Sequence, residues 1–211
     1  TAHTLLVSPP TNKTQVLDDV TFRLLVALRY HIDITKNSGL RCEKCNKDTS
    51  LWHILRCRIE QMGMLLKTHD KIKGIIGSAL KRNKNITNIK YEQAGSNSER
   101  TKHIPDIVVS MIDGTEHLLD ITIENKYIDK RKSGYEPERG KVLKKRQYKG
   151  SEEEVHPLIF DNSGRISTET LQYMRAMGIT KGVMKYIQTL IVKSNGHALQ
   201  RASQKAIAAN E

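Results

Sequence analysis

Two aspartates in this sequence have types and spacing that could support catalysis. Asp120 interrupts the apolar run "LLDITI", and Asp106 follows Pro105. Burying a carboxylate without a partner is costly, so Asp120 needs either a partner or a role for its charge. A three-residue loop ending at Gly114 would set Asp106 directly opposite Asp120 on one face of a hairpin. A two-residue Asp-Gly loop would instead put the two carboxylates on different faces.

Two neighbouring carboxylates repel each other, so one of them must take up a proton or a cation must lie between them. Carboxylate oxygens that face a phosphate suit Mg²⁺. We therefore predict a site for Mg²⁺ (or Mn²⁺) at Asp106 and Asp120. In the alternative interpretation, Pro105-Asp106 is only a turn and Asp120 pairs with a nearby lysine.

The basic segment "RGKVLKKRQYKG", residues 139–150, follows this hairpin. As a helix it lays Lys141, Lys144, Lys145 and Tyr148 along one broad side. One lysine there is a candidate to orient the attacking water or to stabilise a pentacovalent phosphate. For most of these lysines a solvated basic face is the favoured interpretation.

All three cysteines lie close to one histidine, in the pattern Cys42-x2-Cys45-x7-His53-x3-Cys57. A tetrahedral zinc ion needs four nitrogen or sulfur ligands, and this stretch supplies four. The pattern predicts a closed structural zinc site, which leaves no open position for hydrolysis. The alternative is a set of reduced core cysteines with His53 on a helix.

The overall charge indicates a polyanionic partner. The chain of 211 residues has 35 Lys plus Arg against 23 Asp plus Glu, a net charge of +12. Such a balance is typical of nucleic-acid-binding proteins, although a lysine-rich proteome is the plain alternative. No apolar stretch approaches the ~20 residues of a membrane helix, so we expect no membrane partner.

The elements that must position these residues follow from periodicity. We expect a helix over 14–30, a helix that Thr68 caps, strands at 86–92 and on both sides of Asp113-Gly114, and a helix at 138–149. A strand at 156–160, a helix from Ser167 to Gly178 and a helix from Thr180 follow. This order predicts an α/β (α+β) fold with a mixed central sheet.

These motifs, in this order, resemble the restriction-like endonuclease domain of early-branching LINE-type (non-LTR) retrotransposon proteins. The similarity rests on the Cys-Cys-His-Cys knuckle, on "KTHDKI" with His69 and Asp70, on Pro105-Asp106 and Asp120, and on the tail "HPLIFDNSGRISTETLQYMRAMGI". It covers roughly residues 40 to 180.

The resemblance implies a PD-(D/E)XK nuclease fold in four parts. These are an N-terminal helical segment (1–38), the zinc knuckle (39–60), the nuclease core (61–165) and C-terminal helices (166–211). The implied activity is Mg²⁺-dependent nicking of target DNA, whose freed 3′-hydroxyl primes reverse transcription by another domain of the same polyprotein. Target DNA and element RNA are the implied nucleic-acid partners, and the implied location is the nucleus, without secretion.

The resemblance also assigns site residues. Asp106 and Asp120 hold the catalytic metal, and His69, Lys141, Arg146 and Tyr148 are candidates for DNA contact. The sequence departs from the Asp-x-Lys pattern because Thr122 occupies the lysine position. Relatives often supply this lysine from the next helix, which points to Lys144 or Lys145.

Several alternatives stay open. Glu92 and Glu124 are either additional carboxylates of the site or surface residues. Thr122 favours a second hypothesis, in which the chain is a catalytically weak, zinc-containing nucleic-acid-binding module. A third hypothesis is a structural domain that only docks partners.

Overall fold

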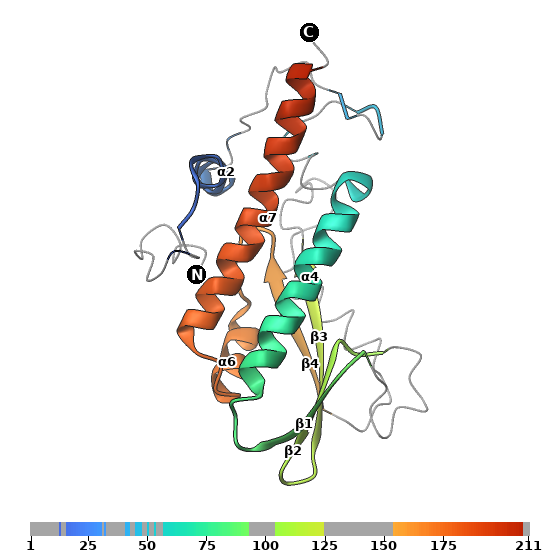
Figure 1. Cartoon of the computed structure of the whole chain (residues 1–211), viewed down its shortest axis with the longest axis vertical. Coiled ribbons are helices and arrows are strands. Elements are labelled where there is room, and N and C mark those ends of the chain that lie inside the picture. The colour runs from blue at the N-terminus through green and yellow to red at the C-terminus, as the bar shows by residue number, and fades with distance from the viewer. Residues whose placement is uncertain are drawn as a thin grey trace.

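The computed structural model describes residues 13, 16–30, 32, 41–42, 45–47, 50, 53, 57–92, 104–124 and 154–208. Its elements, in chain order, are α2 (Asp19–Tyr30), α4 (Arg58–Leu80), β1 (Ile86–Tyr91), β2 (Ile107–Met111), β3 (Glu116–Glu124), β4 (Glu154–Asp161), α6 (Thr168–Ala176) and α7 (Lys181–Ala208) (Figure 1).

The four strands form one mixed sheet in the order β1-β2-β3-β4. The first three strands are antiparallel neighbours, and β4 runs parallel to β3. A parallel pair needs a long crossover connection, for which residues 125–153 provide the length. The predicted helix at 138–149 belongs to this connection and lies outside the described residues. The mixed α/β class predicted from the sequence is confirmed.

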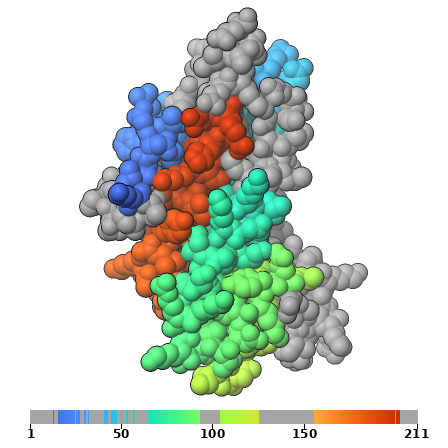
Figure 2. Space-filling view, in the orientation of Figure 1, coloured from blue at the N-terminus to red at the C-terminus, as the bar shows by residue number. Residues whose placement is uncertain are grey.

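One face of the sheet packs against three helices. The main core joins Ile72 and Ile76 of α4, Met174 of α6 and Ile187 of α7 to alternate strand residues such as Leu119. Figure 2 shows α7 and α4 side by side on one surface of the molecule, with the strands below α4. Because side chains alternate along a strand, Val108 and Leu118 point to the second face, where they form a separate buried cluster.

Most predicted elements occur near their expected positions. The strand expected at 86–92 is β1, and the strand expected at 156–160 is β4, which is longer. Ser167 caps α6 as predicted, since its side chain accepts a hydrogen bond from the Thr170 backbone N–H. Gly178, with φ of +79°, follows the end of this helix.

The predicted N-cap at Thr68 is wrong, because α4 begins ten positions earlier, at Arg58, after the extended residue Cys57. Thr68 lies inside the helix and is buried. Its hydroxyl hydrogen-bonds the Ser194 hydroxyl of α7 at 2.6 Å, so it joins two helices instead of capping one. The predicted boundary at residue 60 falls in the first turn of α4, and the division into domains stays a prediction.

Among the described residues, none of the helices combines the length and the apolar character that crossing a membrane requires.

Candidate carboxylate site and zinc cluster

The hairpin between β2 and β3 has the register predicted from the three-residue loop. Ile107 pairs with Leu119, and Ser110 pairs with Glu116. The loop closes where the Met111 N–H donates to the Thr115 carbonyl at 2.8 Å. Gly114 has φ of +86°, the left-handed conformation that favours glycine. Extending this register by one pair beyond Ile107 and Leu119 brings Asp106 opposite Asp120.

The two carboxyl groups are in contact. Asp120 is only 6 % exposed, and its carboxyl group hydrogen-bonds that of Asp106. Asp106 Oδ2 also accepts a hydrogen bond from the Ile121 backbone N–H at 2.6 Å. A hydrogen bond between two carboxyl groups requires a shared proton, and a divalent cation is the chemical alternative to that proton. The oxygen donors are therefore of the kind that Mg²⁺ binds.

His69 of α4 contacts the same carboxylate. Its Nε2 lies 3.1 Å from Asp106 Oδ2, and its Nδ1 lies 3.3 Å from Asp70 Oδ1. The hydrogen bond to Asp106 raises the pKa of His69. Burial alone would raise the pKa of Asp106, but the hydrogen bonds from His69 and Ile121 outweigh it, and the pKa of Asp106 is lowered. In this structure His69 therefore orients Asp106, and its predicted contact with DNA stays a prediction.

Sequence reasoning missed Lys73, one helical turn after His69. Lys73 pairs with Asp70, at 3.2 Å, and with Glu92 at the end of β1. The Glu92 backbone, at φ of +49°, donates its N–H to the Asp106 carbonyl at 3.1 Å. The i, i+4 spacing of His69 and Lys73, which places both on one helix face, was the available signal. Glu92 thus belongs to the surroundings of Asp106 and is paired with a lysine.

Thr122, at the position of the missing lysine, points to the same sheet face as Asp120. Its hydroxyl oxygen is buried and has no hydrogen-bond partner among the described residues. The predicted catalytic lysines, Lys144 and Lys145, lie outside the described residues, as do Lys141, Arg146 and Tyr148. Their roles stay predictions.

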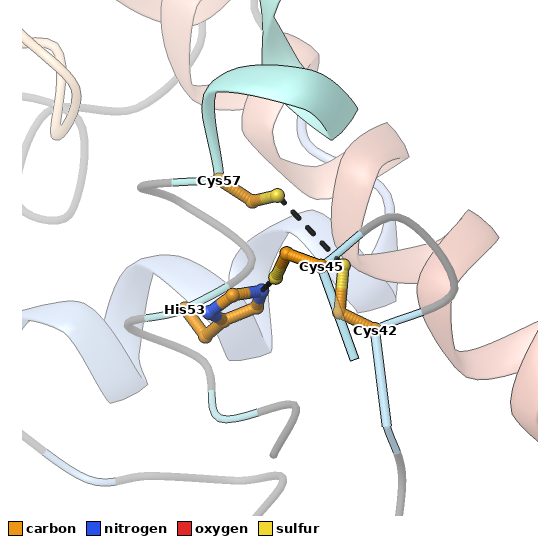
Figure 3. Close-up of side chains that lie close together, drawn as sticks. All are labelled: Cys42, Cys45, His53 and Cys57. Atoms are coloured by element: carbon orange, nitrogen blue, oxygen red, sulfur yellow. Dashed lines mark hydrogen bonds between the residues drawn. The ribbon is translucent and has the colours of Figure 1, made fainter. Parts of the chain in front are cut away.

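The four predicted zinc ligands come together in one cluster (Figure 3). The ligand atoms of Cys42, Cys45, His53 and Cys57 all lie within 4.8 Å of one another. Cys42 Sγ and Cys57 Sγ are 3.7 Å apart, and Cys45 Sγ lies 3.3 Å from His53 Nε2. Tetrahedral zinc with Zn–S bonds of about 2.3 Å would separate two sulfurs by roughly 3.8 Å. The cluster could therefore bind zinc without large rearrangement.

Local backbone structure positions the residues of this cluster. The Asn46 N–H donates to the Cys42 carbonyl at 2.7 Å, and Asn46 has φ of +52°, so the backbone directly after Cys45 lies against Cys42. The Ser50 hydroxyl accepts a hydrogen bond from the His53 backbone N–H at 3.0 Å. Cys57 is the N-cap residue of α4, where the partial positive charge of a helix N-terminus favours a thiolate.

A comparison with models of known protein families finds no match for this sequence, and a comparison with curated proteins finds none either.

Zinc content tests the cluster. We expect the purified wild-type chain to hold one equivalent of zinc and Cys45→Ser to lose it, because a closed structural site needs all four ligands. Atomic absorption measures the metal. Lys47→Ala shortens an exposed side chain beside the cluster and keeps the Lys47 carbonyl that accepts a hydrogen bond from the Cys42 N–H, so this control should keep its zinc. A wild-type chain that lacks zinc after purification without chelator would contradict the assignment.

The His69–Asp106 pair predicts a pH-dependent stability. Because the folded state raises the pKa of His69 above 6.5, the contribution of the pair to the unfolding free energy is complete below that pH. The contribution is lost as the pH rises through the raised pKa. Urea unfolding of wild type and His69→Ala, without added magnesium, should show a free-energy difference that is largest below pH 6.5 and shrinks as the pH rises through the raised pKa of His69. If the difference in unfolding free energy grew as the pH rose, the hydrogen bond between His69 and Asp106 would be contradicted.

Proposed function

We propose that this chain is a Mg²⁺-dependent endonuclease that nicks DNA by hydrolysing a phosphodiester bond. The observation that carries the proposal is the pair of contacting carboxyl groups, Asp106 and Asp120, set opposite each other by the hairpin. The net charge of +12 supports a polyanionic substrate. The order of α4, three antiparallel strands and a parallel fourth strand supports a restriction-like core of the PD-(D/E)XK type.

Each described residue has a distinct task in this proposal. Asp106 and Asp120 would supply the oxygen ligands of a metal ion, which when bound would polarise the scissile phosphate and lower the pKa of the attacking water. His69 fixes the orientation of the Asp106 carboxylate through Oδ2, and the Ile121 N–H contacts the same oxygen. The metal would take the place of the proton that Asp106 shares with Asp120. Asp120 is buried, and the cost of burying its negative charge would be offset by the bound cation.

A lysine that assists the water or the developing charge comes from the segment after β3 in this proposal. Lys144 and Lys145 remain the candidates. Lys73 is less suited to this task, because Asp70 and Glu92 already neutralise its charge.

The biological setting of the proposal follows from the resemblance to retrotransposon proteins. A nick with a free 3′-hydroxyl would prime reverse transcription by a polymerase domain of the same polyprotein. Target DNA, element RNA and that reverse transcriptase domain are the proposed partners, and the nucleus is the proposed location.

A second candidate function is a catalytically weak, zinc-containing nucleic-acid-binding module. Thr122 favours it, because a buried hydroxyl stands where the Asp-x-Lys pattern has its lysine. In this case DNA binding would persist with a steep salt dependence, but no strand would be cut.

Nicking of a supercoiled plasmid separates the two functions. We expect the wild-type chain to convert the plasmid to its open circular form with Mg²⁺ and not with EDTA. Asp120→Asn should slow this conversion on the order of 10³-fold or more, since metal-assisted charge stabilisation amounts to several kcal/mol.

Asp113→Asn is the matched control. Asp113 lies in the loop of the same hairpin, is exposed, and accepts hydrogen bonds from Thr115 that an asparagine can still accept. This variant should nick at the wild-type rate. Wild-type protein that binds the plasmid but leaves it supercoiled would refute the nuclease and support the binding module. Equal nicking by wild type and Asp120→Asn would exclude the carboxylate pair as its source.

A further inference from the structure

A groove runs between α4 and α7, on the side of α4 that faces away from the carboxylate pair. It has a volume of about 570 Å³. Its apolar lining includes Ile75 of α4 and Val183 and Leu190 of α7. The two helices lie side by side in Figure 2, and the groove follows their line of contact.

Positive charge lines this groove. Lys71 of α4 and Arg82, just after α4, belong to its wall, and both are exposed. Among the described residues that line it, none is acidic. Neither cation takes part in an ion pair within the described residues, in contrast to Lys73 on the other side of α4. The two charges are therefore available to an anionic ligand.

An aromatic ring completes the lining. Tyr186 of α7 is 37 % exposed and borders the groove between the apolar residues and solvent. Exposed aromatic rings beside cations are the combination with which proteins bind unpaired nucleotides, since bases stack on the ring and phosphates contact the cations. Double-stranded nucleic acid would leave the apolar lining unused, because its bases are already stacked and paired.

The groove is separate from the proposed catalytic site. His69 and Lys71 are two positions apart, which on an α-helix corresponds to a rotation of about 200°. His69 faces Asp106, so Lys71 and Ile75 face the opposite side of α4.

We propose that the α4–α7 groove binds single-stranded nucleic acid, with Tyr186 stacking on a base and with Lys71 and Arg82 contacting phosphates. This inference is independent of the nuclease proposal, since strand binding requires no metal and no hydrolysis.

The test is fluorescence anisotropy of a labelled oligothymidylate in magnesium-free buffer, over a series of salt concentrations. Tyr186→Ala should weaken binding about tenfold, the usual contribution of one stacked base, and Tyr186→Phe should retain it. Lys71→Ala and Arg82→Ala should each reduce the slope of log K against log salt by about 0.7, the value for one phosphate contact on a single strand.

Arg175→Ala is the matched control, because Arg175 is exposed on α6, which does not line the groove, and it takes part in no ion pair within the described residues. It should leave both the affinity and the slope unchanged. Equal effects of Arg175→Ala and Lys71→Ala would overturn the proposal, and so would wild-type affinity in Tyr186→Ala.

Two further probes identify the occupant. A duplex of the same length should bind without sensitivity to Tyr186→Ala. An acidic amphipathic peptide that binds through Tyr186, while the oligonucleotide does not, would assign the groove to a protein partner and overturn the proposal. If Tyr186→Ala fails to unfold cooperatively in urea, its affinity is not interpreted. The salt-dependence slopes of Lys71→Ala and Arg82→Ala then test the proposal, and slopes equal to that of the wild type would overturn it.

Discussion

The rest of the site depends on the hydrogen bond between the carboxyl groups of Asp106 and Asp120. Two carboxyl groups stay this close only with a shared proton or a cation, so the chain must stabilise an arrangement that is unfavourable by itself. The loop ending at Gly114 fixes the register, the Ile121 N–H holds one oxygen, and His69 approaches that oxygen from α4. The metal site that we propose would form when a divalent cation replaces this shared proton.

The helix α4 connects three features that lie far apart in the sequence. Its N-cap is Cys57, a predicted zinc ligand, and its middle turns carry His69 toward the carboxylates. Its opposite side, with Lys71 and Ile75, forms one wall of the groove against α7. The hydroxyl pair of Thr68 and Ser194 fastens α4 to α7 between these features. A zinc ion at Cys57 would therefore anchor the first turn of the helix on which both proposed surfaces depend.

The parts of this arrangement that sequence could predict depend on local geometry. The left-handed position of Gly114 sets the register of the hairpin, so counting along the chain was enough to place Asp106 opposite Asp120. The short spacing from Cys42 to Cys57 likewise predicted the zinc cluster. Thr68 could not be placed in this way, because the Ser194 hydroxyl that it contacts is distant in sequence. The ion pair of Lys73 with Glu92 and the groove beside Tyr186 also depend on such tertiary contacts.

The most direct test of a metal site at the carboxylate pair is a titration of zinc-loaded protein with Mn²⁺. Electron paramagnetic resonance measures how much Mn²⁺ is bound. Manganese is a hard cation that reports on a magnesium site. We expect one Mn²⁺ site in the wild-type chain, from which Mg²⁺ displaces the Mn²⁺, and no such site in Asp106→Asn or Asp120→Asn. A site that binds Mn²⁺ equally well in all three proteins would contradict the claim that these carboxylates exchange their shared proton for a metal ion.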